Sequence, residues 1–235
     1  MSGCRGFPST AARTTAWCSP SCSATTRNNS ITSRHQACCR AASPTPDTIA
    51  DVTLRFPVPP MKATMGSTTA VPDGADWAFE VKWDGYRTIV HIADGAARLQ
   101  SAAGHDVTAR WPEFAELADS VNASTAILDT ELVVFDDDGR PRFELVQQSG
   151  AGSTREAVLQ IFDVVQIDGV DVIDLPYEAR RRLLEQLVEP GPNWTVPTPR
   201  IGGGAELLEA TASQGLEGVI AKRVDSLYRP GTRSK

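Results

Sequence analysis

Hydrophobic and polar residues alternate along the stretch FEVKWDGYR, residues 79–87. Successive side chains of a β-strand point to opposite faces, so this alternation predicts one apolar face and one charged face. The apolar face carries Phe79, Val81 and Trp83, and the charged face carries Glu80, Lys82 and Asp84. The local pattern alone favours a solvated charged surface over the floor of a polar pocket.

The alternation continues on both sides of this stretch. WAFEVKW, RTIVHIA and AARLQSA follow one another within residues 77–102 and are separated by Asp-Gly pairs at 84–85 and 94–95. Such spacing predicts a hairpin or a meander of three strands. The proline-rich residues 56–66 that precede it are expected to lie against the domain as a lead-in segment.

Strands and helices are interspersed in the rest of the chain. Strands are predicted at 125–136, 157–168 and 216–223, and helices at 111–121, 177–188 and 205–215. The helix at 177–188 has the clearest pattern, because its apolar residues share one face and three arginines begin its exposed side. The order of elements predicts an α+β domain built from antiparallel sheets with flanking helices.

Charge divides the chain into two parts. Residues 1–50 contain five arginines and one acidic residue, a net charge of +4, whereas residues 51–235 contain 18 basic and 28 acidic residues, a net charge of −10. We therefore expect a disordered or mis-annotated basic tail at 1–52 and a folded domain at 53–235.

All five cysteines fall in the basic tail, which is rich in Ser, Thr and Ala. Three other interpretations of the tail stay open: a zinc site formed by Cys18, Cys22, His35 and Cys38, an organelle transit peptide, and upstream sequence translated from a misassigned start codon. The chain has no apolar run of eighteen residues and no secretion signal, so we expect no membrane span and an intracellular protein.

Charged residues also interrupt otherwise apolar strands at three separate places. Lys82 is the first, Asp129 and Glu131 are the second, and Glu217 and Lys222 bracket the third, EGVIAKR. A pair of carboxylates within a strand costs free energy if it faces the core. Glu131 and Glu217 are candidate metal ligands, Arg87 and Lys222 are candidate phosphate-binding cations, and Lys82 remains as a candidate nucleophile.

KWDGYR, residues 82–87, resembles the KxDGxR motif of ATP-dependent DNA ligases, and EGVIAKRVDSLYRPGTRSK, residues 217–235, resembles their fourth motif with its downstream segment. The resemblance runs from about residue 57 to the last residue and is greatest to the ligase domain of the bacterial end-joining ligases of the ligase D type. It also takes in GHDVTARWPE, LDTE, FD and LPYEARRRLLE. It implies a nucleotidyltransferase domain with an ATP-grasp-like fold.

The resemblance implies a reaction in which a lysine amine attacks ATP, expels pyrophosphate and passes AMP to a 5′-phosphate of nicked or broken double-stranded DNA. Lys82 would be the adenylated residue, while Glu131 and Glu217 would hold Mg²⁺ or Mn²⁺. Phe162 would stack on adenine, Glu80 would lie by the base, and Arg87 and Lys222 would contact sugar and phosphate. The Asp84-Gly85 turn would bring the chain close to the nucleotide. The resemblance therefore implies a cytoplasmic, nucleoid-associated bacterial protein that acts with end-joining proteins.

The sequence also departs from the family pattern. Ala102 and Ala103 stand where the family has a cation, and Thr130 replaces a glycine, which we expect to add a side chain near the nucleotide. The sequence stops at Lys235, before the expected lysine-bearing strand and the oligonucleotide-binding barrel. A fragment, a domain that works with a separate barrel, and a decayed copy without activity remain open.

Two other functions compete with DNA ligation. RNA ligases and capping guanylyltransferases share the KxDG motif, but LPYEARRRLLE and SLYRPG argue against them. A non-catalytic or decayed nucleotide-binding fragment is the main alternative, and Ala102, Thr130 and the missing segment favour it.

Overall fold

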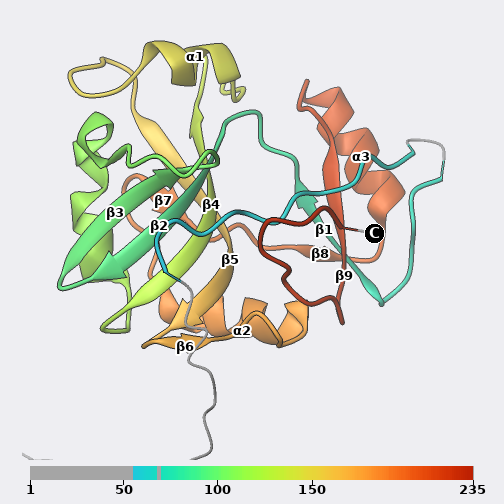
Figure 1. Ribbon diagram of the computed structural model, residues 1–235. Helices are drawn as coiled ribbons and strands as arrows, with labels where there is room; N and C mark the ends of the chain where they lie inside the picture. Colours follow the sequence, from blue (N-terminus) through green and yellow to red (C-terminus); the bar gives the residue numbers. More distant parts are fainter. Residues whose placement is uncertain (1–54, 68–69, 235) are drawn as a thin grey trace, which may run out of the picture. The chain divides into compact units, whose positions relative to one another are not determined.

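The computed structural model describes residues 55–67 and 70–234, all within a unit that runs from Ala50 to Lys235. The interpretations of residues 1–52 lie outside these described residues. The described part contains two β-sheets, mainly antiparallel, with helices on their outer sides (Figure 1). The predicted α+β class is therefore confirmed. No helix in the described part is long and apolar enough to cross a membrane.

The larger sheet has the strand order β3-β2-β4-β5-β6, and β7 pairs in parallel with β5. Its strands are β2 Tyr86–Ala93, β3 Ala96–Ser101, β4 Ala126–Val134, β5 Ala157–Ile167, β6 Val170–Asp171 and β7 Trp194–Thr195. β4 and β5 follow the predicted ranges 125–136 and 157–168 closely. Both strands are buried along most of their length, because the sheet is covered on both faces.

One face of the larger sheet carries the main hydrophobic core. Leu128, Leu132 and Ile161 point into this core, where they meet apolar residues of the two helices η2 and α2. The opposite face carries a smaller cluster formed by Val58, Ile89, Ile127, Val165 and Tyr228. The lead-in segment and the C-terminal segment therefore cover the second face.

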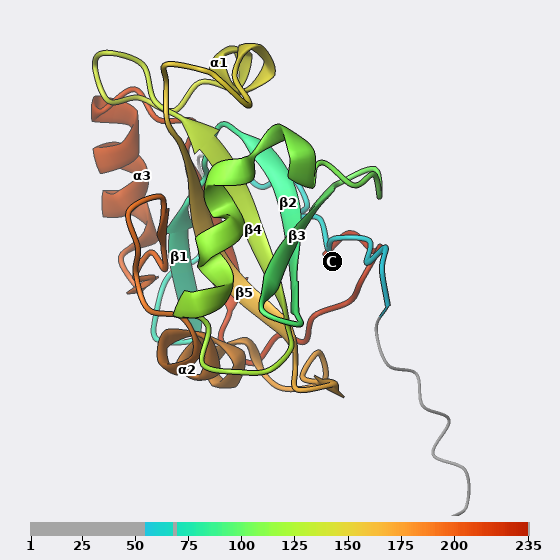
Figure 2. The same cartoon turned by 90° about the vertical axis from the view of Figure 1, so that its left-hand side faces the viewer.

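The smaller sheet has the order β8-β1-β9, with β1 at Trp77–Val81, β8 at Arg200–Ile201 and β9 at Val219–Arg223. Helix α3, Gly204–Ser213, lies beside β1 (Figure 2). The prediction of three consecutive paired strands at 77–102 is therefore wrong for the first strand, since β2 and β3 form a hairpin whereas β1 pairs with β8 and β9.

Residues 82–85 cross from one sheet to the other and explain this difference. A side chain on Gly85 would place its Cβ 2.3 Å from the Leu132 carbonyl oxygen, so only glycine allows the chain to pass this close to β4. Asp84 accepts a hydrogen bond from the backbone of Phe143 at 3.2 Å. Gly85 thus allows the chain to pass close to β4, whereas the sequence predicted that the Asp84-Gly85 turn would bring the chain close to the nucleotide.

The helices also differ in part from expectation. Residues 112–120 form a 3₁₀-helix, η2 Pro112–Ser120, where an ordinary helix was predicted, and a further short 3₁₀ turn, η1, spans Thr108–Arg110. Helix α1, Phe143–Gln148, was not predicted.

Helix α2, Tyr177–Leu187, lies where a helix was predicted, but of the three arginines predicted to be exposed only Arg182 is. Arg180 and Arg181 are buried, at 2% and 5% exposure. Arg180 faces the larger sheet because Asp163 in β5 accepts two hydrogen bonds from its guanidinium, at 2.8 and 2.9 Å. A buried carboxylate in the sheet therefore determines which side of the helix turns inward.

Candidate active site

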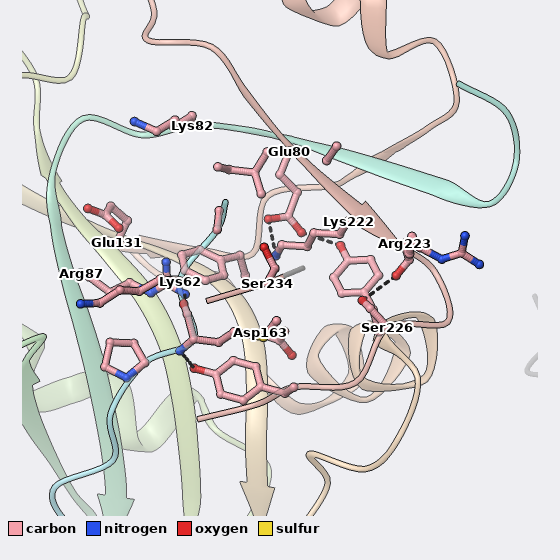
Figure 3. A pocket seen from close by; sticks show the side chains of 18 of the residues that line it. Lys62, Glu80, Lys82, Arg87, Glu131, Asp163, Lys222, Arg223, Ser226 and Ser234 are labelled. Carbon is pink, nitrogen blue, oxygen red and sulfur yellow. Dashed lines mark hydrogen bonds and ion pairs between the residues drawn. The ribbon is translucent and has the colours of Figure 1, made fainter. Parts of the chain in front are cut away.

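A pocket of about 530 Å³ opens between the two sheets (Figure 3). Strands β1 and β9 of the smaller sheet form one wall, and β2, β4 and β5 of the larger sheet form the other. The lining also includes Ala102, Tyr177 and Arg180 of α2, and residues 60–63, 226–228 and 233–234. The lining includes all the candidate site residues except Glu217, namely Glu80, Lys82, Arg87, Glu131, Phe162 and Lys222.

Lys82 follows the last residue of β1 and lies at an open side of the pocket. Its backbone N–H donates to the Gly218 carbonyl at 2.9 Å, which extends the pairing of β1 with β9 by one residue. Its ammonium group contacts the carboxylate of Glu217, and both side chains are partly exposed, at 39% and 45%. Strand pairing thus brings together two residues that are 135 positions apart.

Glu80 lies deeper in the pocket and is 8% exposed. Lys222 of β9 donates to one of its carboxylate oxygens at 2.7 Å, and the Tyr177 hydroxyl donates to the other. Burial, together with the charge of Glu80, raises the pKa of Tyr177 well above its ordinary value, so the phenol stays a donor. The carboxylate of Glu80 is therefore held from two sides, as Figure 3 shows.

Arg87 of β2 forms a second ion pair within the pocket wall. Its guanidinium donates two hydrogen bonds to Asp129, at 2.5 and 2.7 Å, and Tyr228 donates another to the same carboxylate at 2.6 Å. Burial would lower the pKa of Arg87, but Asp129 more than offsets this and raises that pKa. Asp129, which the sequence marked only as a charge within an apolar strand, is thus the counterion of Arg87.

Phe162 lies between these two ion pairs. The Arg87 guanidinium lies 4.4 Å from the centre of its ring, and the Lys222 ammonium lies 4.7 Å from it. The ring is 9% exposed and lines the pocket. It is an aromatic platform with cations above it, an arrangement that stabilises both partners.

Glu131 points into the pocket from β4, directly opposite Arg87 in the strand register. Burial raises the pKa of this carboxyl to about 7, although Arg87 and, more weakly, Lys82 act in the opposite direction. No hydrogen bond to its carboxylate is found within residues 55–67 and 70–234. Glu131 is thus a partly buried acid that a further cation in the pocket would stabilise in its charged form.

The described residues contain no cluster of three or more acidic, histidine or cysteine side chains suited to a metal. Glu131 and Glu217 nevertheless fit a Mg²⁺ ion, because this ion is usually held by one or two carboxylates together with substrate phosphates and water. Lys82 connects the two acids, since it contacts Glu217 and its charge acts on Glu131. The donor set is suited to a metal that arrives with a phosphate.

Thr130 does not extend into the pocket. Its side chain is fully buried, and its hydroxyl donates to the Thr88 carbonyl at 2.8 Å on the side of the sheet opposite to Glu131. The expectation that Thr130 adds a side chain near the nucleotide is therefore wrong, because strand alternation turns it toward the main core. Ala102, in contrast, does line the pocket.

Several residues of the pocket were missed by the sequence analysis. Tyr177 and Tyr228 each donate to a buried carboxylate, and Arg180 pairs with Asp163. A carboxylate within an apolar strand, such as Asp163, signals that a buried donor lies nearby. The sequence does not say which donor it is.

Comparisons with known proteins identify the family to which the chain belongs. A family model described as the ATP dependent DNA ligase domain matches residues 60–235. The multifunctional non-homologous end joining protein LigD of Mycobacterium bovis is 42% identical over 174 residues, which cover 74% of this chain and 22% of that protein. The LigD protein of Pseudomonas aeruginosa is 36% identical over 173 residues, covering 70% of this chain and 20% of that protein.

A solved structure described as mycobacterial DNA ligase D complexed with ATP and MES is 38% identical, with a TM-score of 0.66, and the match covers 75% of this chain and 57% of that one. This likeness confirms the predicted nucleotidyltransferase fold. The chain spans only about a fifth of the length of the two LigD relatives. The matched family model and these relatives together show that the chain belongs to the family of ATP-dependent DNA ligase domains.

Proposed function

We propose that this chain is the adenylating part of an end-joining DNA ligase and that Lys82 carries the AMP. The observation that supports this most directly is the position of the Lys82 amine. It lies at the open side of a pocket, in contact with one candidate metal ligand and within electrostatic reach of the other. A lysine on a solvated sheet surface would have no such surroundings.

In the proposed step the neutral amine of Lys82 attacks the α-phosphorus of ATP. A nitrogen–phosphorus bond forms, the bond from that phosphorus to the bridging oxygen breaks, and pyrophosphate leaves with the electron pair. The ammonium group of Lys82 first releases one proton to water to give the neutral amine, and the nitrogen releases a second proton as the new bond forms, so the phosphoramidate keeps one N–H. Glu217 holds the ammonium form before ATP binds, so this contact must loosen before the attack.

The nucleoside would occupy the inner part of the pocket. Phe162 offers its ring for stacking with adenine, and Glu80 offers carboxylate oxygens to donors on the base. Arg87 and Lys222 lie over the Phe162 ring. Stacking on the face that they cover would require both cations to move toward the ribose and phosphates, where the family resemblance assigns them.

A Mg²⁺ or Mn²⁺ ion would be held by Glu131 and Glu217. Such an ion neutralises charge on the phosphate oxygens during the transfer. The raised pKa of Glu131 supports this assignment, since a partly buried carboxyl without a hydrogen-bond donor in the described part gains from a bound cation. Glu217 would exchange its contact with Lys82 for the metal.

The substrate that receives the AMP would be the 5′-phosphate of nicked or broken double-stranded DNA, which places the protein with the nucleoid in the bacterial cytoplasm. Residues 51–235 carry a net charge of −10, so this part has a weak electrostatic hold on DNA. End-joining proteins or a separate oligonucleotide-binding domain would then hold the DNA. The names of the relatives support an end-joining context.

The test is to incubate the purified chain with ATP labelled at the α-phosphate and Mg²⁺, and to look for label that survives denaturation. We expect label on the wild type and none on Lys82→Ala or on Lys82→Arg, which keeps the positive charge. Chelation of the metal should abolish labelling, and α-labelled GTP should not replace ATP. A labelled Lys82→Arg protein would exclude Lys82 as the acceptor, and an unlabelled wild type would favour a non-catalytic nucleotide-binding protein.

A further inference from the structure

Most cations that line the pocket already have an acidic partner. The pairs are Lys82–Glu217, Arg87–Asp129, Arg180–Asp163, Lys222–Glu80 and Arg223–Asp225. Lys62 and Arg233 line the same pocket, yet neither forms an ion pair within the described residues. Both are exposed residues at the rim of the pocket (Figure 3 labels Lys62). They are therefore the lining cations with charge available for an anionic ligand.

The backbone fixes these two residues side by side. Lys62 and Arg233 form a parallel β-bridge, with the Lys62 N–H donating to the Thr232 carbonyl at 2.9 Å and the Ser234 N–H donating to the Lys62 carbonyl at 2.8 Å. The Arg233 guanidinium also donates to the Ala63 carbonyl at 2.7 Å. This bond uses one of its five N–H groups, so the others remain able to bind a ligand.

We propose that Lys62 and Arg233 form a binding subsite for the β- and γ-phosphates of the nucleotide, the part that leaves as pyrophosphate. This inference rests on the proposed function. The two cations and Lys82 line one continuous pocket, so a triphosphate with its α-phosphorus at Lys82 can extend its tail toward the rim. Paired lysine and arginine side chains are typical ligands of phosphate oxygens.

The charge balance of the pocket supports a polyphosphate as the ligand of this pair. Arg87 and Lys222 lie in ion pairs that help to hold the wall, and their release would leave Asp129 and Glu80 without partners. Lys62 and Arg233 can bind phosphate without breaking an ion pair in the described part. The least costly place for the negative tail is therefore the rim.

The test compares the affinities for ATP and AMP by calorimetry in the wild type, Lys62→Gln, Arg233→Gln and the double variant. Each substitution should weaken ATP binding by about tenfold, as expected for a charge-assisted hydrogen bond at an exposed site, and the double variant should lose more. AMP binding should stay within about twofold, because AMP lacks the two distal phosphates. Arg229→Gln is the matched control, since Arg229 lies in the same segment and pairs with Asp174 outside the pocket.

The possible results separate this inference from the proposed function. Equal losses for ATP and AMP, or an unchanged preference for ATP, would overturn the subsite while wild-type adenylation of Lys82 still supported the function. Loss of DNA binding with unchanged ATP affinity would assign the two cations to DNA and also overturn it. A wild type that neither binds ATP nor becomes adenylated would reject both proposals.

Discussion

The ion pair between Arg87 and Asp129 allows a quantitative prediction about stability. Asp129 is fully buried, while the Arg87 side chain is 30% exposed. Asp129→Asn leaves the guanidinium without a counterion and deprives the Tyr228 hydroxyl of a charged acceptor. Removal of one partner of a buried pair costs about 3–5 kcal/mol. Because Arg87 keeps partial access to water, we expect about 3 kcal/mol, the lower end of that range.

Urea unfolding of the metal-free protein, followed by tryptophan fluorescence, would measure this loss from the shift in midpoint at constant slope. For a domain of this size, 3 kcal/mol corresponds to a fall in Tm of about 6–12 °C. Asp174→Asn is the control, because its pair with Arg229 is exposed and worth at most about 1 kcal/mol. An Asp129→Asn variant no less stable than this control would refute the reasoning.

A double-mutant cycle then separates the free energy of the Arg87–Asp129 interaction from that of the other contacts of Asp129. Arg87→Met together with Asp129→Asn removes both charges, so the double variant should be more stable than the sum of the single losses predicts. Additive losses would mean that Asp129 acts through Tyr228 alone.

Three further predictions concern positions near the pocket. Gly85→Ala should destabilise the fold by about 1–3 kcal/mol and slow adenylation, because its Cβ would overlap the Leu132 carbonyl; calorimetric unfolding and the labelling assay measure both. Thr130→Val should cost about 1 kcal/mol in urea unfolding through the lost hydrogen bond and leave the KM for ATP unchanged. Tyr177→Phe should remove the hydrogen-bond donor to one oxygen of Glu80 without removing a charge. We therefore expect a reduced preference for ATP over GTP in binding, with the fold retained.

Strand alternation predicted much of the larger sheet but not the place of Phe162. Leu159 and Ile161 of β5 point into the main core, and so does Val164. This spacing of two and then three residues reflects a β-bulge, since Asp129 pairs with Asp163 and Thr130 pairs with Ile161. Phe162 is the extra residue, so it and the adjacent Asp163 both line the pocket, which strict alternation would not allow. A period of two in the sequence carries no sign of this inserted residue.

The sheet to which β1 belongs could not be predicted from local pattern either. An Asp-Gly pair between alternating segments is a typical hairpin signal, and at 94–95 it does form a hairpin turn, with positive φ at both residues. At 84–85 the same pair crosses between sheets, because the contact with β4 requires a glycine. The partners of β1 come from more than 100 residues downstream, so only long-range pairing decides its sheet.

Charged residues within apolar strands indicated five of the candidate site residues, and the family resemblance added Glu80 and Phe162, but local pattern did not show that these residues meet at one pocket. Lys82, Glu80 and Lys222 face one pocket because β1 and β9 pair in register, with Ala78 opposite Lys222. Glu131 joins them from the other sheet. A period-two pattern identifies the face on which a charge lies, but it does not show that two charged faces belong to different sheets that meet across a pocket.

The same arrangement has a consequence for how an anion would enter. The described ion pairs make the inner pocket nearly neutral before any ligand binds, so a phosphate that passes the rim cations Lys62 and Arg233 meets no unpaired cation among the described lining residues. It must instead exchange partners with the carboxylates, and each exchange leaves an acid that needs a new cation. Glu217 is the partner most easily released, because it and Lys82 are the most exposed of these pairs. A metal that arrives with the nucleotide would take up the released carboxylate, so nucleotide and metal should bind cooperatively.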